Sequence, residues 1–93
     1  MKTLSKKEKA SLEEILLVFS KRIYRDSGMR HFSGGYARAN IKDFDDDFIY
    51  IKTEFGEHNV DGATKYDDQY VMPRAVLIKD SPIENKISAI RLT

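Results

Sequence analysis

The most concentrated chemistry in the sequence is the acidic run Asp43-Phe44-Asp45-Asp46-Asp47. Carboxylate oxygens are the ligands that calcium and magnesium prefer, so the run has the composition of a hard-cation loop. It does not complete the Asp-x-Asp-x-Asp-Gly pattern of a calcium loop, because Phe48 stands at the position of the glycine. We therefore expect no dedicated metal site and interpret the run as the turn of a hairpin.

Two histidines, His31 and His58, are the imidazoles available for acid–base chemistry. Neither has a second ligand at metal-site spacing. A histidine beside Arg22, Arg25 or Arg30 has the side chains of a small ribonuclease, but no spacing in the sequence fixes that geometry. The chain also has no Gly-rich phosphate loop, no GxSxG motif and no dinucleotide fingerprint. We predict a non-catalytic protein without a cofactor and keep the ribonuclease as a third, weaker alternative.

Basic residues interleaved with aromatic ones form another candidate feature. The basic members are Lys21, Arg22, Arg25, Arg30 and Arg38, and the aromatic members are Tyr24, Phe32 and Tyr36. Cations contact phosphates while rings stack on bases, so this mixture is typical of a surface that binds single-stranded nucleic acid. The alternative is a basic helix end that complements the helix dipole.

Length and composition restrict the class of protein. A chain of 93 residues, 41% hydrophobic, is one small domain with a single core. The absence of cysteine excludes a disulfide framework and a thiolate zinc site. No apolar run approaches the roughly 20 residues that span a bilayer, and the N-terminus has no signal-peptide core. We therefore expect a cytoplasmic protein without a membrane partner.

The net charge of +1 conceals a segregation along the chain. Residues 1–42 carry ten Lys or Arg against four Asp or Glu, whereas residues 43–68 carry two against nine. Opposite charges on separate parts of a surface can steer a polyanion or align neighbouring copies. The alternative is ordinary solvated charge, because blocks of sequence need not be patches of surface.

The elements that would position these residues begin with a helix over residues 1–26. Leu12, Ile15, Leu16, Phe19 and Ile23 recur at helical spacing and form its apolar stripe. Two capping-box patterns, at residues 5–8 and 11–14, leave the start of the helix open by about two turns.

Strand patterns occupy most of the remaining chain. Residues 36–53 predict a hairpin, and residues 54–68 a polar excursion or long loop. Residues 69–79 predict a strand that breaks at Pro73 and is followed by a second apolar run, because proline cannot donate to a ladder. Residues 80–85 read as a turn and 86–93 as a final strand. We predict a single domain, 1–93, with the helix capping a strongly bent, five-stranded antiparallel barrel over 34–93.

Part of the first hairpin follows a fixed pattern of a glycine, a hydrophobic residue, a Phe-Asp pair and an alternating strand, namely Gly34, Ile41, Phe44-Asp45, Phe48, Ile49 and Ile51. This pattern resembles the first signature of Sm-like proteins, including the bacterial host-factor type. The segment 69–76 is similar to the family's fourth and fifth strands, which flank a short basic loop. The chain departs from the pattern at Ala39, where the family often has a second glycine.

The resemblance implies a homo-oligomeric ring of five to eight copies, joined by strand pairing, that binds single-stranded RNA without catalysis. It assigns loop orientation to Asp45, base stacking to Phe48 and a phosphate or base contact to Arg74. Together with Arg30 and Arg38 from the basic segment, these are the nucleic-acid-binding residues we expect, with single-stranded DNA as the other possible ligand.

Each residue carried over from the family has a structural alternative. Phe48 stands at the start of a strand, where it can be a core residue instead of a base-stacking one. Asp45 can form hydrogen bonds to the backbone of its own turn. Arg74, beside Pro73, can be a solvated loop residue. The carboxylates at 45–47 also repel phosphate, so the second hypothesis is a protein-binding or assembly module whose acidic 43–47 loop meets a basic partner.

Overall fold

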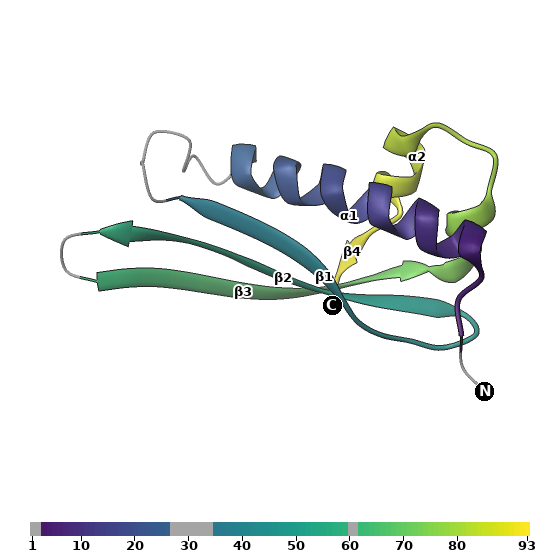
Figure 1. The fold of residues 1–93 in the computed structure, drawn as a ribbon, viewed down its shortest axis with the longest axis horizontal. Coiled ribbons are helices and arrows are strands. Elements are labelled where there is room, and N and C mark those ends of the chain that lie inside the picture. The colour runs from purple at the N-terminus through teal and green to yellow at the C-terminus, as the bar shows by residue number, and fades with distance from the viewer. Residues whose placement is uncertain (1–2, 27–34, 60–61) are drawn as a thin grey trace.

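A helix lies along one face of an antiparallel sheet (Figure 1). The computed structural model describes residues 3–26, 35–59 and 62–93, with the side chains of all of these except 57–59 and 62–65. The elements in chain order are α1 (Lys6–Asp26), β1 (Tyr36–Phe44), β2 (Phe48–Asn59), β3 (Gly62–Pro73), the 3-10 helix η2 (Arg74–Ile78), α2 (Ile83–Ser88) and β4 (Arg91–Leu92). The prediction of an N-terminal helix followed by mainly β structure is confirmed.

Helix α1 begins at the first of its two candidate capping boxes. The Ser5 hydroxyl oxygen accepts a hydrogen bond from the Glu8 amide at 3.1 Å, and the Ser5 amide donates to Glu8 Oε1 at 3.0 Å. Leu12, Ile15 and Phe19 are buried, as their helical spacing predicted. The apolar stripe therefore faces the sheet.

The sheet has the strand order β1-β2-β3-β4, and every neighbouring pair is antiparallel. Side chains alternate between its two faces, so Ile49, Ile51 and Thr53 of β2 point toward α1 and are buried. Met72 of β3 is buried beside them. The Tyr70 and Phe19 rings pack edge to face, with their centroids 5.0 Å apart. The core therefore lies between α1 and this face of the sheet.

Residues 54–68 were predicted as a polar excursion or long loop, but residues 54–59 and 62–68 extend the sheet instead. β2 and β3 stay in register from Phe48 opposite Pro73 to Asn59 opposite Gly62. In Figure 1 this end of the hairpin reaches beyond the C-terminal end of α1, so α1 does not cover it. Polar residues are therefore acceptable there, and their polarity concealed the strands. The Asp61-Gly62 dipeptide was an available hairpin signal.

The C-terminal segments also differ from the prediction. β3 ends at Pro73 as expected, but the apolar run after it forms η2, which buries Leu77. The predicted final strand is replaced by α2 and the two-residue β4, and of the predicted turn only residues 80–82 lie outside α2. Ile83, Ile87 and Ile90 pack on the core at the i, i+4, i+7 spacing of a helix. In the strand predicted over residues 86–93, Ile87 and Ile90 would lie on opposite faces, so the strand could not place both against the core.

The predicted five-stranded barrel is corrected to an open sheet. The described residues form four strands, with β1 at one edge and β4 at the other. A barrel closes only when its first and last strands pair, whereas β4 pairs with β3 alone, through Tyr70 and Val71. Within the described part of the chain, no helix is long and apolar enough to cross a membrane.

Truncating the core should destabilise the protein, whereas truncating an exposed isoleucine should not. Ile51 is fully buried, so Ile51→Ala should lower the free energy of unfolding by about 2–5 kcal/mol. Ile78, which is 53% exposed, provides the matched control, and Ile78→Ala should change it by less than about 0.5 kcal/mol. Urea denaturation measures both; equal losses in the two variants would contradict the assigned core.

Candidate nucleic-acid interface

The acidic run forms the turn between β1 and β2, and Asp45 holds it together. Asp45 Oδ1 accepts hydrogen bonds from the amides of Asp47 at 2.8 Å and Phe48 at 2.7 Å. The Asp45 amide donates to the Phe48 carbonyl at 3.0 Å, and its Oδ2 accepts from the Tyr50 hydroxyl at 3.1 Å. Both carboxylate oxygens therefore bond within the chain, as the turn interpretation of Asp45 requires.

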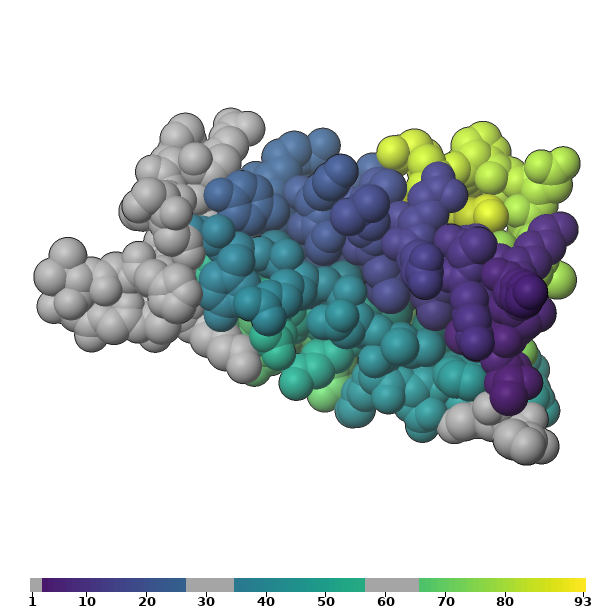
Figure 2. Space-filling view, in the orientation of Figure 1, coloured from purple at the N-terminus to yellow at the C-terminus, as the bar shows by residue number. Residues whose placement is uncertain are grey.

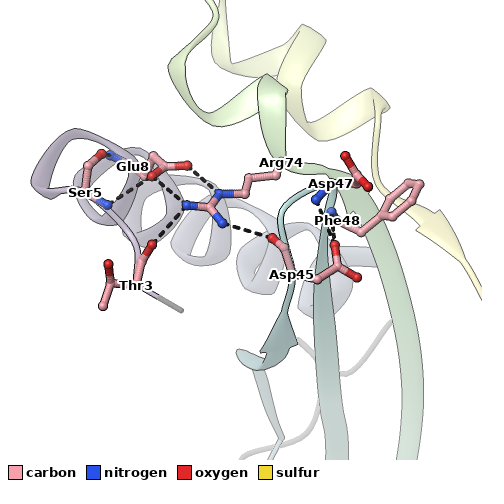
Figure 3. A network of polar contacts seen from close by, with 7 residues as sticks. All are labelled: Thr3, Ser5, Glu8, Asp45, Asp47, Phe48 and Arg74. Atoms are coloured by element: carbon pink, nitrogen blue, oxygen red, sulfur yellow. Dashed lines mark hydrogen bonds and ion pairs between the residues drawn. The ribbon is translucent and has the colours of Figure 1, made fainter. Parts of the chain in front are cut away.

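Arg74 joins this turn to the start of α1 (Figure 3). Its Nε and Nη2 donate to the two carboxylate oxygens of Glu8 at 2.7 and 3.1 Å. Nη1 donates to the Asp45 carbonyl and Nη2 to the Thr3 carbonyl, each at 3.0 Å. The guanidinium fork thus connects the N-terminus, the first hairpin turn and the end of β3.

The environment of Arg74 is largely enclosed. Its side chain is 17% exposed and that of Glu8 13%, and the guanidinium lies 5.5 Å from the Phe44 ring centroid. A nucleic-acid contact by Arg74, as the Sm-like resemblance implied, would have to compete with these bonds. We therefore place Arg74 in the scaffold and leave it out of the proposed interface.

The ion pair changes the acidity of both partners. Hydrogen bonds from the Arg74 side chain and then from the Ser5 amide lower the pKa of Glu8 from 4.5 to about 2. The same bond to Glu8 raises the pKa of Arg74. The hydrogen bond to Asp45 raises the pKa of the Tyr50 hydroxyl, because the carboxylate accepts its proton.

Phe48 and Arg38 share the face of the sheet that α1 does not cover. They alternate with the buried residues, and in Figure 3 the Phe48 ring points away from Glu8 and Arg74. Phe48 is 43% exposed, so it is not the core residue that its strand position allowed. The Arg38 guanidinium lies 5.3 Å from the Tyr36 ring centroid. Arg30 lies outside the described residues.

We call this uncovered surface the open face. Strand register and alternation assign to it Tyr36, Arg38, Asn40, Asp43, Phe48, Tyr50, Lys52, Glu54, Asp67, Gln69, Val71, Pro73 and Arg91. The pairing shifts between Ile41 and Asp43, which makes Lys42 the extra residue of a β-bulge. Lys42 Nζ donates to Gln69 Oε1 at 2.9 Å, across the intervening β2.

A hollow of about 310 Å³ lies at one end of the open face. Its lining residues are Phe48, Val71, Met72, Pro73, Ala89 and Arg91. Most of this wall is apolar, and Arg91 supplies a cation at its border. The combination of an exposed ring, an apolar wall and a guanidinium can hold a flat aromatic ligand that carries negative charge. No sequence pattern selects Arg91, because its position beside Phe48 depends on β4 pairing with β3.

The basic end of α1 does not join the open face. Arg22 forms an ion pair with Glu84 of α2, and Arg25 pairs with Asp26 at 3.2 Å. Both belong to α1, which lies on one face of the sheet in Figure 1, whereas strand register and exposure place Phe48 on the other face. The predicted cluster of cations and rings is therefore divided between two faces. His31 and the His58 side chain, proposed for the ribonuclease alternative, lie outside what the structure describes.

Among the side chains that the structure describes, no three His, Cys, Asp or Glu residues gather in a group that could hold a metal ion. Asp45 bonds to backbone amides and to Tyr50, which accounts for its position in the acidic turn without a cation.

Comparison of the chain with models of protein families, with curated proteins and with solved structures gives no match. A function for the chain therefore has to be inferred from the geometry of the open face and from the motifs in its sequence.

The Glu8–Arg74 pair should make the stability of the fold depend on pH. The pKa of Glu8 is 4.5 without these bonds and about 2 in the folded chain. The pair therefore makes its full contribution to the stability of the folded chain above pH 4.5. That contribution should fall as the pH drops from 4.5 toward 2. Glu8→Gln removes it, so the difference in Tm between the two proteins should be largest near neutral pH and shrink toward pH 2.

Glu13→Gln provides the control, because Glu13 is an exposed residue of the same helix. Thermal unfolding followed by circular dichroism between pH 2 and 7 compares the three proteins. A Glu8→Gln variant that keeps the wild-type acid response would show that this pair does not govern it.

Proposed function

We propose that the chain binds single-stranded nucleic acid on the open face of its sheet, without catalysis. The observation that carries this proposal is the exposed Phe48 ring beside Arg91 in a hollow of the uncovered face. A buried ring would serve only the core, whereas a ring that is 43% exposed on a rigid strand is available for stacking.

The aromatic residues of β2 can support a base. The rings of Phe48 and Tyr50 lie side by side, with centroids 6.4 Å apart. Stacking of a base on a protein ring contributes about 1–3 kcal/mol and does not depend strongly on which base is present. Bases in a duplex are already stacked, so this mode selects unpaired strands. The bond from Asp45 fixes the Tyr50 hydroxyl and with it the orientation of the second ring.

The cations near these rings can contact phosphates. Arg38, Lys52 and Arg91 lie on the open face, and Lys42 reaches across it. The Lys52–Glu54 pair, at 3.7 Å and exposed, is of a kind that contributes little to stability, so Lys52 can exchange its partner for a phosphate. Carboxylates of Asp43, Glu54 and Asp67 share the face, so we expect moderate affinity that decreases with salt.

The resemblance to Sm-like proteins favours RNA as the ligand. The open face offers a binding mode that a single copy can provide, so the proposal does not require a closed ring. The exposed carboxylates of Asp46 and Asp47 support the alternative, in which the turn binds a basic protein partner. The two functions differ in ligand charge, and a nucleic-acid binding measurement separates them.

Removing the Phe48 ring should weaken binding to a fluorescein-labelled oligo(U) strand, measured by fluorescence anisotropy at low salt. A loss of about 1–3 kcal/mol of stacking corresponds to roughly 5- to 150-fold weaker binding by Phe48→Ala. Arg91→Gln should also weaken binding and reduce its dependence on salt. Added salt should weaken binding by the wild type, and a duplex of equal length should bind less well.

Tyr66→Ala is the matched control, because Tyr66 is 51% exposed but lies on the sheet face that bears α1. It should leave the affinity unchanged. No binding by the wild type at low salt, or equal losses for Phe48→Ala and Tyr66→Ala, would overturn the proposal. A gel of the recovered strand checks catalysis, since cleavage would favour the ribonuclease alternative.

A further inference from the structure

A hollow of about 470 Å³ lies between the N-terminal half of α1 and the segment that runs from η2 into α2. Figure 2 shows these two parts of the chain side by side, the start of the helix in purple and the C-terminal residues in yellow-green. The volume of the hollow is within the range of about 300–1,000 Å³ that small-molecule sites occupy. None of its lining residues belongs to the open face, so the proposed nucleic-acid binding does not use it.

Lys86 of α2 is held at this hollow by two neutral acceptors. Its Nζ donates to Ser11 Oγ of α1 at 3.2 Å and to the Leu77 carbonyl of η2 at 3.3 Å. Lys86 is partly buried, and among the described residues it forms no ion pair with a carboxylate. Burying a charge is costly unless the charge is paired. An ammonium has three N–H donors, so one remains for an anion in the hollow.

Two more ammonium groups line the same hollow. Lys7 comes from the first turn of α1 and Lys79 follows η2, and both residues are exposed. Neither forms an ion pair with a carboxylate of the described chain. Three like charges that come from three segments repel one another, and a bound anion would relieve this repulsion. The Ser11 and Ser81 hydroxyls also line the hollow and can donate to the oxygens of such an anion.

Two carboxylates, those of Glu14 and Asp80, restrict what the hollow can bind. They would repel a chain of phosphates such as a nucleic-acid backbone, so the lining favours a ligand with a single anionic group. Carboxylates also accept hydrogen bonds from hydroxyl groups. None of the described residues of the lining is aromatic, so a nucleobase would find no ring to stack on. These groups together fit a ligand that joins one phosphate to several hydroxyls.

We propose that this hollow binds a small sugar phosphate. Lys86 binds the phosphate, and its two bonds within the chain fix its position before the ligand arrives, which reduces the ordering cost of binding. The exposed Lys7 and Lys79 supply the remaining positive charge. The hydroxyls of the sugar donate to Glu14 and Asp80.

The test is isothermal titration calorimetry of the full chain with ribose 5-phosphate and with glucose 6-phosphate. At least one of them should bind with a dissociation constant below millimolar, and at least about tenfold more tightly than inorganic phosphate or the unphosphorylated sugar. Lys86→Gln removes the fixed cation and should weaken this binding by at least about tenfold. Lys79→Gln should weaken it as well, and because Lys79 is exposed this change should leave the fold intact.

Lys52→Gln is the matched control, because Lys52 is an exposed lysine of the open face. It should retain the wild-type affinity for the sugar phosphate, and thermal unfolding checks that each variant keeps its fold. The proposal would be overturned if neither sugar phosphate bound at millimolar concentration or if inorganic phosphate bound as tightly. Unchanged affinity in both Lys86→Gln and Lys79→Gln would also overturn it. No nucleic acid is used, so the result is independent of the proposed function.

Discussion

The ion pair between Glu8 and Arg74 is the constraint that the rest of the structure depends on. Its bonds connect the first turn of α1, the turn between β1 and β2, and the end of β3. Desolvating two charges is costly unless their remaining donors and acceptors are satisfied. Here the backbone carbonyls of Asp45 and Thr3 and the amide of Ser5 supply those partners. The helix is thus fixed over the sheet at one end by directional bonds and along its length by apolar packing.

This attachment determines which face of the sheet remains available. With α1 fixed over Ile49, Ile51 and Met72, the alternate residues of the same strands stay in contact with solvent. One strand therefore serves two purposes, since Ile49 and Ile51 fill the core while Phe48 and Tyr50 present rings on the open face. Arg74, to which the family resemblance assigned an RNA contact, stabilises this arrangement. Arg91, from the edge strand β4, supplies the cation beside Phe48.

The open sheet also explains why an edge is left over. A barrel would pair β1 with the last strand, but the last strand has two residues because η2 and α2 use the C-terminal isoleucines and leucine to cover the core. Because the C-terminal segment forms η2, α2 and a two-residue β4, a hollow is left at the open face and β1 has one neighbouring strand in the described chain. The hollow of the proposed ligand surface and the open edge of the sheet thus have a common structural origin.

Local patterns in the sequence determined α1, the first hairpin with its acidic turn, and the end of a strand at Pro73. Each depends on interactions within a few residues, such as the Ser5–Glu8 capping box or the missing amide of proline. Residues 54–68 were misjudged because polar residues and glycines interrupt the alternation that identifies a strand. The C-terminal strand was predicted from the partial alternation of residues 86–93, whereas burying Ile83, Ile87 and Ile90 together requires helical spacing.

Only the tertiary structure decided the partner of Arg74, the exposure of Phe48 and the position of Arg91. These depend on contacts between residues far apart in sequence, such as Arg74 with Glu8, which no local spacing encodes. The apolar residues of β2 mark one face of the sheet for burial, but only the tertiary structure shows that α1 is the element that covers it.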